Sequence, residues 1–522
     1  MKIYAYDTTL RDGSQAPKVS FSLEDKLRIV QKLDEFGIDY IECGWPGANP
    51  KDTALFERLK KLKLNSKIVA FGSTRRPNKR AHEDQQVLEL IRSGVNTITI
   101  FGKSWDFHVH NALKTSLEEN LEMVYETIEF LKNNVEEVIF DAEHFFDGYK
   151  ANKEYALKVI KAAKEAKADW IVLCDTNGGA LPGEVFEIVR EVKKELGEVK
   201  LGIHAHNDAE CAVANSVMAV LAGASQVHGT INGIGERCGN ANLCSVIANL
   251  QLKSGYRVVS QESLKKLTQL SHFVSEISNI PIPANMPYVG EGAFSHKAGV
   301  HASAILKDTR TYEHIDPSLV GNSRKVVVSD LSGRSNLRHR LSQMGLEVDE
   351  NSPELLKLLE RIKQLEKEGY QFEAADASFE LLCLRHFGIL KEFYELEAYR
   401  VLIARRREDS LPVSEATVRI KVAGTIQHTV SLGNGPVSAL DGALRKCLEE
   451  FYPSLKEVEL KDYRVRIVNE QEGTKARVRV LIQSTDGRRE WGTVGVSENI
   501  IEASWIALSD SLTYKLVKDE LI

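Results

Sequence analysis

Eight short apolar runs, each followed by an amphipathic stretch, occupy the first half of the chain, and this alternation restricts the fold more than any other feature. The runs are rich in β-branched and aromatic residues, and the stretches between them keep the three-to-four spacing of one-sided helices. Eight such pairs in about 250 residues match the length of a closed (β/α)8 TIM barrel. The expected strands are Ile3–Asp7, Tyr40–Gly44, Lys67–Phe71, Thr97–Phe101, Glu137–Ala142, Trp170–Asp175, Lys200–His204 and Gln226–Ile231.

An open, doubly wound parallel sheet is the alternative fold for this pattern. It is disfavoured because no glycine-rich dinucleotide-binding turn follows the first strand. Polar residues also gather after the expected strands, whereas the helix-to-strand turns read as plain connections. This one-sided polarity is typical of a barrel enzyme, whose site lies at the C-terminal ends of the strands. The residues concerned are Arg11, Asp12, Glu143, His144, Thr176, His204, His206 and Asn240.

A divalent metal site is predicted from four of these residues. His204 and His206 lie two apart at a strand end, so both imidazoles point to the same side. In a closed barrel the seventh, eighth and first strands are neighbours, which brings Asn240 and Asp12 to the same point. Two imidazoles and a carboxylate suit a first-row metal with open positions. Taken alone, the histidine pair is a weak indication of a metal, and Arg11-Asp12-Gly13 would be an ordinary turn.

The substrate expected at such a site can chelate a metal, as a 2-oxo acid does. Arg11 would then place a fixed positive donor beside the ketone oxygen, where negative charge grows during attack by a carbon nucleophile. Its alternative role is an ion pair within the barrel. Glu143 would face the same cavity and move protons, and Thr176 is a candidate hydroxyl donor.

The rest of the chain predicts two further parts. We expect the barrel domain over 1–280, loop and helical linker subdomains that contribute to the active site over 281–410, and a C-terminal α+β domain over 411–522. In that domain Val418, Ile420 and Val422 alternate with charged residues, and a helix follows. The order recurs once, so we infer two strand-strand-helix units, with Tyr463, Val465 and Ile467 as an added strand. The open face of such sheets suits pairing with a second copy, as in a homodimer.

Composition excludes several partners. Lys+Arg 68 against Asp+Glu 74 gives a net charge of −6, without the basic blocks that track nucleic acid. No apolar run reaches the roughly 18 residues needed to span a bilayer, and Met1-Lys2 leads directly into the first strand. Seven scattered cysteines without a C-x-x-C pair fit reduced thiols. We therefore expect a cytoplasmic protein that binds neither nucleic acid nor membrane.

Three motifs resemble those of the 2-isopropylmalate, homocitrate and citramalate synthases, which are acetyl-CoA-dependent Claisen condensing enzymes. The motifs are Thr9–Gln15, His204–Asp208 and Asn232–Asn240. The resemblance implies that a divalent metal (Mn, Mg or Zn) is held by Asp12, His204, His206 and Asn240. It also implies that Arg11 polarises the keto group and that Glu143 is a catalytic carboxylate. Further catalytic roles are implied for His301 and Tyr312, which relatives receive from the partner subunit of a dimer.

Four further segments resemble the citramalate synthase branch of that family, namely 45–52, 71–76, 101–105 and 369–373. Pyruvate is then the expected acceptor for acetyl-CoA, and the product is citramalate, a precursor for isoleucine. Phe71, Phe101 and Phe107 lie at or just past strand ends and would shrink the pocket to a methyl group, although all three also suit a place in the core or at its rim. Close alternatives are the 2-isopropylmalate and homocitrate reactions, because one methylene distinguishes substrates by only about 1–3 kcal/mol.

The resemblance extends to the C-terminal segment, which is similar to the allosteric and dimer domain of the family. It implies feedback by a branched-chain amino acid, isoleucine if citramalate is the product. Two rivals from other classes are a catalytically silent barrel that senses amino acids and a metal-dependent hydrolase or aldolase that uses no CoA. The intact set of polar residues at the strand ends disfavours the first rival, and release of CoA would exclude the second.

Overall fold

The structure, a computed structural model, describes residues 1–296, 299–326, 334–349, 351–372, 374–405, 412–468 and 476–520. The chain forms two compact units. One comprises Met1–Phe294 with His314–Arg324, and the other Ser295–Glu313 with Lys325–Ile522. The predicted boundary between 410 and 411 lies outside the described residues, and the division at 280 stays a prediction.

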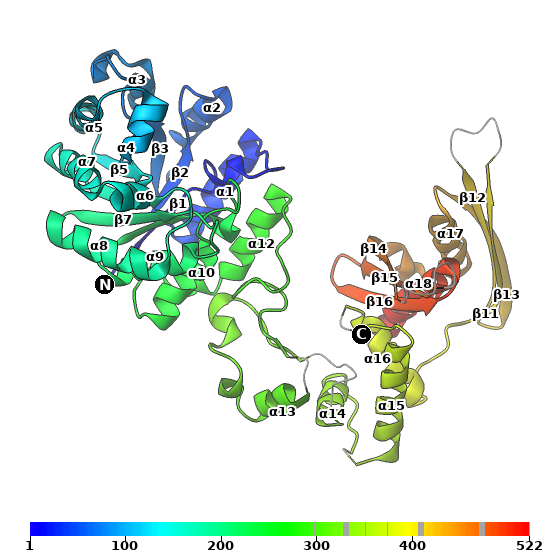
Figure 1. Ribbon diagram of the computed structural model, residues 1–522. Coiled ribbons are helices and arrows are strands. Elements are labelled where there is room, and N and C mark those ends of the chain that lie inside the picture. The colour runs from blue at the N-terminus through cyan, green and yellow to red at the C-terminus, as the bar shows by residue number, and fades with distance from the viewer. Residues whose placement is uncertain are drawn as a thin grey trace. The chain divides into compact units, whose positions relative to one another are not determined.

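Eight parallel strands of the first unit close into a barrel in chain order, with β8 hydrogen-bonded back to β1 (Figure 1). The strands are β1 (Tyr4–Asp7), β2 (Tyr40–Gly44), β3 (Lys67–Ser73), β4 (Thr97–Lys103), β5 (Glu137–Glu143), β6 (Trp170–Asp175), β7 (Lys200–Ala205) and β8 (Gln226–Gly229). Closure confirms the predicted TIM barrel. It excludes the open sheet, whose two edge strands would remain unpaired.

Helices follow the strands and form the outer layer of the barrel (Figure 1). They are α1 (Leu23–Phe36), α2 (Pro50–Leu59), α3 (Gln85–Arg92), α4 (Asp106–His108), α5 (Leu117–Lys132), α6 (Phe145–Ala151), α7 (Lys153–Glu165), α8 (Pro182–Leu196), α9 (Ala212–Leu221), α10 (Leu243–Ala248), α11 (Gln261–Leu264) and α12 (Leu267–Ser278). Local sequence sets their ends. For example, Ser22 and Asp25 form a capping box before α1, and Gly37 ends that helix at a φ of 90°.

Every second residue along the strands points into the barrel and fills its interior. The interior core consists of Tyr6, Tyr40, Val69, Ile139, Trp170, Val172 and Cys174. The opposite phase packs outward against the helices in a much larger core, to which Ile41, Ile98, Phe140, Ile171 and Ile203 belong. Because side chains alternate along a strand, residues two and four positions beyond the interior core project into the same space, toward the C-terminal mouth.

The second unit begins with small elements and then a helical part. These are β9 (Ser295–His296), α13 (Gly299–Lys307), β10 (Lys325–Val326), α14 (Arg334–Gln343), α15 (Pro353–Lys367) and α16 (Asp376–His386). Leu337, Leu358, Ile362 and Phe379 share one core with Val494 of the sheet that follows. The helical part is therefore a packed layer on that sheet.

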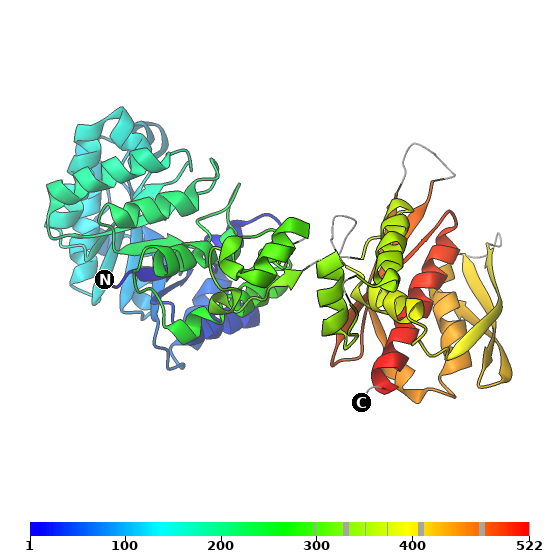
Figure 2. The same ribbon diagram turned by 90° about the horizontal axis from the view of Figure 1, so that it is seen from below.

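Two three-stranded antiparallel sheets, each with one long helix, make up the rest of this unit. They are β11 (Tyr394–Ala404), β12 (Val413–Val422) and β13 (Thr425–Gly433) with α17 (Pro436–Leu448), and β14 (Glu459–Ile467), β15 (Val478–Thr485) and β16 (Glu490–Ser497) with α18 (Ile500–Glu520). Figure 2 shows α18 in red beside the strands that precede it. The two units of the predicted repeat thus occur, and their helices bury the expected residues, such as Leu444 and Trp505.

Each unit of the repeat has a third strand. In the second unit it is β14, the added strand that was predicted from Tyr463, Val465 and Ile467, and only the first unit has a strand that was not predicted. In the first unit this strand is β11, which falls in the segment expected to be a helical linker. All of its residues are exposed or half-buried, and a bulge between Leu396 and Ala398 shifts its register against β12. The strand consequently lacks the alternation that marks a half-buried strand in a sequence.

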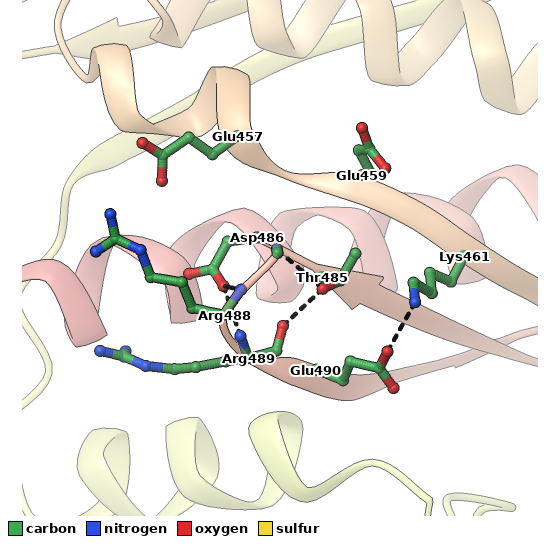
Figure 3. Close-up of a pocket in the computed structure, with 9 residues that line it drawn as sticks. Glu457, Glu459, Lys461, Thr485, Asp486, Arg488, Arg489 and Glu490 are labelled. Atoms are coloured by element: carbon green, nitrogen blue, oxygen red, sulfur yellow. Dashed lines mark hydrogen bonds and ion pairs between the residues drawn. The ribbon is translucent and has the colours of Figure 1, made fainter. Parts of the chain in front are cut away.

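The turn between β15 and β16 closes around a buried cation. Lys515 of α18 lies 3.0 Å from Asp486, 3.0 Å from Asp519 and 3.2 Å from Glu457. Beside it is a cavity of about 520 Å³ (Figure 3). Its lining is Glu457, Glu459, Lys461, Thr485, Asp486, Gly487, Arg488, Arg489 and Glu490. Burial alone would raise the pKa of Asp486. Lys515 and two backbone N–H groups have the larger, opposite effect and lower the pKa to about 2.

This shift predicts an acid-sensitive contribution to stability. The folded-state pKa lies below the unfolded one, so the stabilisation is complete above about pH 4 and is lost as the pH falls through about 2. We expect Asp486→Asn to cost about 2 kcal/mol near neutral pH and almost nothing near pH 2. Urea unfolding across this range measures it. Asp462→Asn, at an exposed position of β14, is the control, and an equal pH dependence in both variants would contradict the assignment.

Candidate active site

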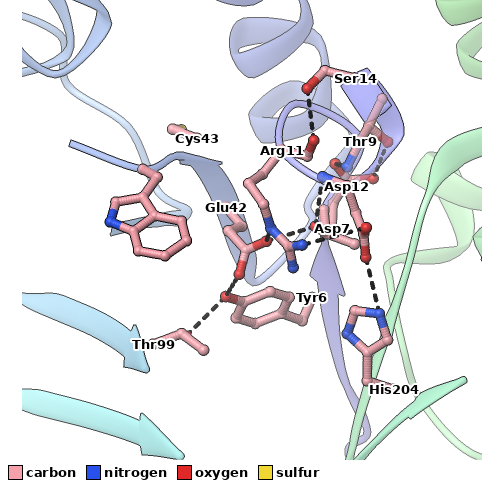
Figure 4. Close-up of polar contacts among 12 residues, drawn as sticks. Tyr6, Asp7, Thr9, Arg11, Asp12, Ser14, Glu42, Cys43, Thr99 and His204 are labelled. Carbon is pink, nitrogen blue, oxygen red and sulfur yellow. Dashed lines mark hydrogen bonds and ion pairs between the residues drawn. The ribbon is translucent and has the colours of Figure 1, made fainter. Parts of the chain in front are cut away.

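The segment after β1 is a tight turn held by its own side chains (Figure 4). Asp7 accepts hydrogen bonds from the backbone N–H and hydroxyl of Thr9, at 2.9 and 2.8 Å. The carbonyl of Thr8 accepts from the backbone N–H of Arg11 and of Gly13. These bonds fix Arg11 and Asp12 at the C-terminal mouth of the barrel. The backbone of Arg11-Asp12-Gly13 is therefore the turn that the sequence alone suggested.

Arg11 is held inside the barrel by a buried carboxylate on the neighbouring strand. Its Nε lies 2.6 Å from Glu42 Oε1 of β2, and Glu42 also accepts hydrogen bonds from Tyr6 and Thr8. A guanidinium nitrogen lies 3.3 Å from Asp12 Oδ1. Burial alone would lower the pKa of Arg11. The negative charges of Asp12 and Glu42 together have a larger effect, so the pKa is raised above its usual value. The guanidinium is therefore a permanent charge with a fixed orientation.

The predicted metal ligands converge in the structure. Asp12 Oδ2 and Asn240 Oδ1 each lie 3.0 Å from Nε2 of His204. The rings of His204 and His206 are 5.3 Å apart. One ligand atom from each of Asp12, His204 and His206 lies within 4.8 Å of the others, and all three residues are buried. Asp12 Oδ2 makes no hydrogen bond of good geometry, which is typical of an oxygen arranged to face a cation.

The loop after β8 delivers Asn240 by pairing with the end of β7. Ala241 donates its N–H to the carbonyl of Ala205, and His206 and Asn240 form an antiparallel bridge. Two glycines permit this course. A Cβ on Gly239, whose φ is +92°, would lie 2.0 Å from the Gly233 carbonyl oxygen, and one on Gly235 would lie 2.2 Å from Asn240 Nδ2. Larger residues at either position would displace the amide.

Charge and burial divide the roles of the ligand side chains. Burial raises the pKa of Asp12, but Arg11 and His204 lower it well below its usual range. Burial, reinforced by His204, lowers the pKa of His206 to about 4. At neutral pH the site therefore offers a carboxylate and an uncharged imidazole, which are the ionisation states that bind metals.

An aromatic wall stands beside Arg11. The guanidinium carbon of Arg11 lies 3.8 Å from the centre of the Phe71 ring. Phe71 stacks on Phe101 at 5.6 Å, and Trp45 meets both rings edge-on at 5.9 Å. Phe71 and Phe101 were predicted to limit the size of the substrate pocket, and Trp45 completes the wall. A buried pair of Lys26 and Asp52 fixes the loop that carries Trp45, since Asp52 accepts from its N–H.

Glu143 and Thr176 lie at the ends of β5 and β6, as predicted. Glu143 forms an ion pair with Lys103, its partner in the register of β4 and β5. The hydroxyl oxygen of Thr176 accepts a hydrogen bond from the backbone N–H of His144 at 2.9 Å, which leaves its proton available for donation. His144 has a φ of 58° and its ring lies 4.0 Å from that of His108.

His301 and Tyr312 belong to the second compact unit. Their rings stack with centres 4.0 Å apart, and both side chains are exposed. The structure therefore brings together the two residues that the sequence places eleven positions apart. Their predicted action at the barrel site stays a prediction.

Sequence reasoning missed three residues of this site. Glu42 lies within an apolar strand, where a single carboxylate gives no signal by spacing. Lys103 belongs to the segment 101–105, which marks the family branch and in which only Phe101 was assigned a role. Asp141 precedes Glu143 by two positions on β5, and burial raises its pKa to about 7. The period of two along β5 was the available signal for Asp141.

Known families match almost the whole chain in three consecutive segments. Residues 2–274 match the HMGL-like family, residues 288–370 the homocitrate synthase post-HMGL domain-like family, and residues 373–516 the LeuA allosteric (dimerisation) domain. None of the helices in the described part of the chain is long and apolar enough to cross a membrane.

Similar proteins cover the chain from end to end. The (R)-citramalate synthase of Aquifex aeolicus is 68% identical over 520 residues, which are 99% of this chain and 98% of that protein. The (R)-citramalate synthase of Geobacter sulfurreducens is 57% identical over 518 residues, again 99% and 98%. This chain belongs to the (R)-citramalate synthase family. A 2-isopropylmalate synthase of Methanocaldococcus jannaschii is more distant, at 34% identity over 99% of this chain and 96% of that protein.

Membership of the citramalate synthase family makes the chain a condensing acyltransferase. It agrees with the predicted branch, which rested on the four short segments beside the barrel mouth and in the linker. Two of those segments contain the aromatic wall residues Phe71 and Phe101. The segments that distinguish this branch of the family thus include the aromatic residues that lie beside Arg11 in the structure.

The arrangement around Glu42 predicts a large difference between buried and exposed carboxylates. We expect Glu42→Gln to lower the free energy of unfolding by about 3 kcal/mol. The substitution leaves the buried guanidinium of Arg11 with Asp12, at the longer distance of 3.3 Å, as its charged partner. Glu57→Gln, at an exposed ion pair with Lys60, should cost less than about 0.5 kcal/mol. Urea unfolding of both variants measures the difference. Equal losses would mean that Asp12 alone holds Arg11.

Proposed function

We propose that this chain condenses acetyl-CoA with pyruvate and water to form citramalate and CoA. The observation that carries the proposal is the convergence of Arg11, Asp12, His204 and His206 at the barrel mouth, beside an aromatic wall. Charged groups suited to a 2-oxo acid thus adjoin an apolar surface suited to a small side chain. The names of the most similar relatives support the same reaction.

Asp12, His204 and His206 would hold a divalent metal ion, with Asn240 as a further ligand. The donor set fits, since one carboxylate and two imidazoles lie within reach of one point and the Asn240 oxygen faces the same nitrogen as Asp12. When bound, Mn²⁺, Mg²⁺ or Zn²⁺ supplies a Lewis acid for the ketone and carboxylate oxygens of the substrate. The coordinating oxygen of Asp12 is kept ionised by Arg11 and His204.

Arg11 would orient the ketone and stabilise the transition state. Its guanidinium cannot lose its proton, and Glu42 and Phe71 prevent it from rotating away. A fixed donor of this kind contributes most where negative charge develops, here on the ketone oxygen as the new carbon–carbon bond forms. Prior orientation also avoids a cost in reorganisation at the moment of reaction.

We assign proton transfer to Glu143 and His301, with Tyr312 and Thr176 as hydroxyl donors. Removal of a methyl proton from acetyl-CoA gives the nucleophile, and hydrolysis of the thioester afterwards releases CoA. Glu143 is kept at the site by Lys103. His301 and Tyr312 already stack on one another, so they would act as one element, and we propose that they serve the site of the partner subunit in a homodimer.

The aromatic wall would select pyruvate over larger 2-oxo acids. Phe71 and Phe101 are stacked, and Trp45 meets both rings edge-on. Each of the three rings therefore holds the other two in place. An isopropyl group in place of a methyl group would then meet a rigid surface. The penalty is overpacking, which typically costs about 1–3 kcal/mol.

The substrate preference is tested by release of CoA from acetyl-CoA with pyruvate, 2-oxoisovalerate and 2-oxoglutarate in parallel. We expect kcat/KM to be highest for pyruvate, by at least about tenfold, which corresponds to about 1.4 kcal/mol. Fastest turnover of 2-oxoisovalerate would favour 2-isopropylmalate synthesis. Turnover of the keto acids without release of CoA would favour an aldolase.

The second unit would regulate the reaction. The LeuA allosteric (dimerisation) domain match over 373–516 supports both dimer formation and control by an amino acid. We propose isoleucine, because citramalate supplies its carbon skeleton. All seven cysteines are free thiols, which supports a cytoplasmic location for the enzyme.

Feedback is tested by adding millimolar isoleucine to the same assay. We expect the rate of CoA release to fall severalfold, with leucine and valine at equal concentration as matched controls. The physical reason is a coupling free energy between two sites, typically about 1–3 kcal/mol. An unchanged rate with isoleucine, or equal inhibition by all three amino acids, would contradict isoleucine as the specific regulator.

A further inference from the structure

The inner nitrogen of His204 is unpaired within the barrel. Its Nε2 faces Asp12 and Asn240, each 3.0 Å away. The other ring nitrogen, Nδ1, points away from Asp12 in Figure 4. It is buried and has no hydrogen-bond partner among the described residues. Buried polar atoms in folded proteins nearly always have a hydrogen-bond partner, so an unpaired nitrogen here calls for an explanation.

Two neighbours on other strands present the same condition. Oδ1 of Asp141 on β5 and Nδ1 of His228 on β8 are also buried and unpaired within the described part of the chain. One ligand atom from each of Asp141, His204 and His228 lies within 4.8 Å of the other two. Strand geometry brings them together, because Asp141 follows the interior residue Ile139 by two positions and His204 and His228 are partners in register.

His228 is the rigid member of this trio. Its Nε2 lies 2.9 Å from Oε1 of Gln226, and its ring stacks on Tyr6 with centres 3.7 Å apart and planes within 6°. Burial lowers its pKa well below the usual range, so the ring is neutral. With the Nε2 proton donated to Gln226, the Nδ1 atom is an acceptor. It cannot supply the proton that the Asp141 carboxylate would accept.

His204 is the natural donor in this arrangement. A neutral imidazole carries one proton, and a lone pair on Nε2 requires that proton on Nδ1. A carboxylate is the strongest acceptor for such an N–H. A direct bond, or one water shared by the three atoms, would satisfy Asp141, His204 and His228 together.

We propose that Asp141 is a positioning residue whose carboxylate accepts the Nδ1 proton of His204 and so turns the Nε2 lone pair toward Asp12 and Asn240. The inference rests on the proposed metal site, which it extends by one layer. Carboxylates behind metal-binding histidines fix the tautomer and ring orientation, and their loss typically weakens metal binding about 10- to 100-fold.

The test is titration of the full-length, metal-free protein with Co²⁺ by calorimetry, together with the visible absorption of the bound Co²⁺. Asp141→Leu removes the acceptor, and Asp141→Asn keeps the shape while removing the charge. We expect Asp141→Leu to weaken Co²⁺ binding about 10- to 100-fold and to alter the Co²⁺ absorption bands, with a smaller effect for Asp141→Asn. Asp141→Glu should recover part of the affinity, which a purely structural role would not predict.

Asp84→Asn is the matched control. Asp84 is a fully buried carboxylate of the same unit, but its oxygens accept hydrogen bonds from Arg76 and Gln86 and touch none of the proposed metal ligands. The Co²⁺ affinity of Asp84→Asn should stay within about threefold of the wild type, because no metal-facing histidine depends on Asp84. An equal loss in Asp84→Asn would attribute the effect to buried charge in general and overturn the proposal.

Histidine tautomers give a readout independent of affinity. In the Zn²⁺-loaded protein labelled with ¹⁵N-histidine, we expect the Nδ1 proton of His204 to resonate far downfield in the wild type, as a proton shared with a carboxylate does, and to move upfield in Asp141→Leu. Unchanged signals, together with unchanged Co²⁺ affinity, would overturn the proposal.

His206→Ala separates the two levels of inference. Loss of Co²⁺ binding in His206→Ala with full binding in Asp141→Leu would support the metal site and reject the role of Asp141. No Co²⁺ binding by the wild type would reject the metal site itself. Two Co²⁺ ions per wild-type protomer and one in Asp141→Leu would make Asp141, His204 and His228 a separate metal site, which also overturns the proposal.

Discussion

The contact between Arg11 and Glu42 is the constraint on which the barrel mouth depends. A carboxylate inside an apolar strand is expensive unless it is fully paired. Glu42 is paired three times, by Tyr6, Thr8 and Arg11. The same bonds hold the turn after β1 against β2. They leave one face of the guanidinium for Phe71 and one nitrogen for Asp12.

The period of two along the strands extends this constraint around the ring. The interior positions next to the aromatic core, toward the C-terminal mouth, carry Glu42, Asp141, His204 and His228. All four of these side chains are polar and buried. A barrel interior is normally filled by branched apolar side chains. Replacing them by ionisable groups sacrifices stability. Glu42 offsets this cost with three hydrogen bonds, whereas Asp141, His204 and His228 each keep one buried polar atom without a partner among the described residues.

The sequence predicted the parts of this structure that depend on local pattern. Alternation gave the eight strands to within a few residues, and the strand-end position of Asp12, His204 and Asn240 predicted their convergence. It could not predict Glu42, because its partners come from a neighbouring strand and the turn that follows it. It also missed β11, whose exposed faces and bulge erase the alternation. Features set by contact between distant strands are visible only once the strands are placed.

Phe71 serves two purposes that are separable in chemistry but joined in this structure. One face of its ring supports the Arg11 guanidinium at 3.8 Å, and its stack with Phe101 is the proposed wall of the substrate pocket. A smaller residue at this position would widen the pocket for longer 2-oxo acids and at the same time release the cation. The same change at Phe101 would leave Arg11 supported but would loosen a different cation, because the Lys103 amine that pairs with Glu143 lies 5.3 Å from the centre of the Phe101 ring. Each of the two neighbouring rings is thus tied to a charge at the barrel mouth, and a change of either ring shifts a different charge.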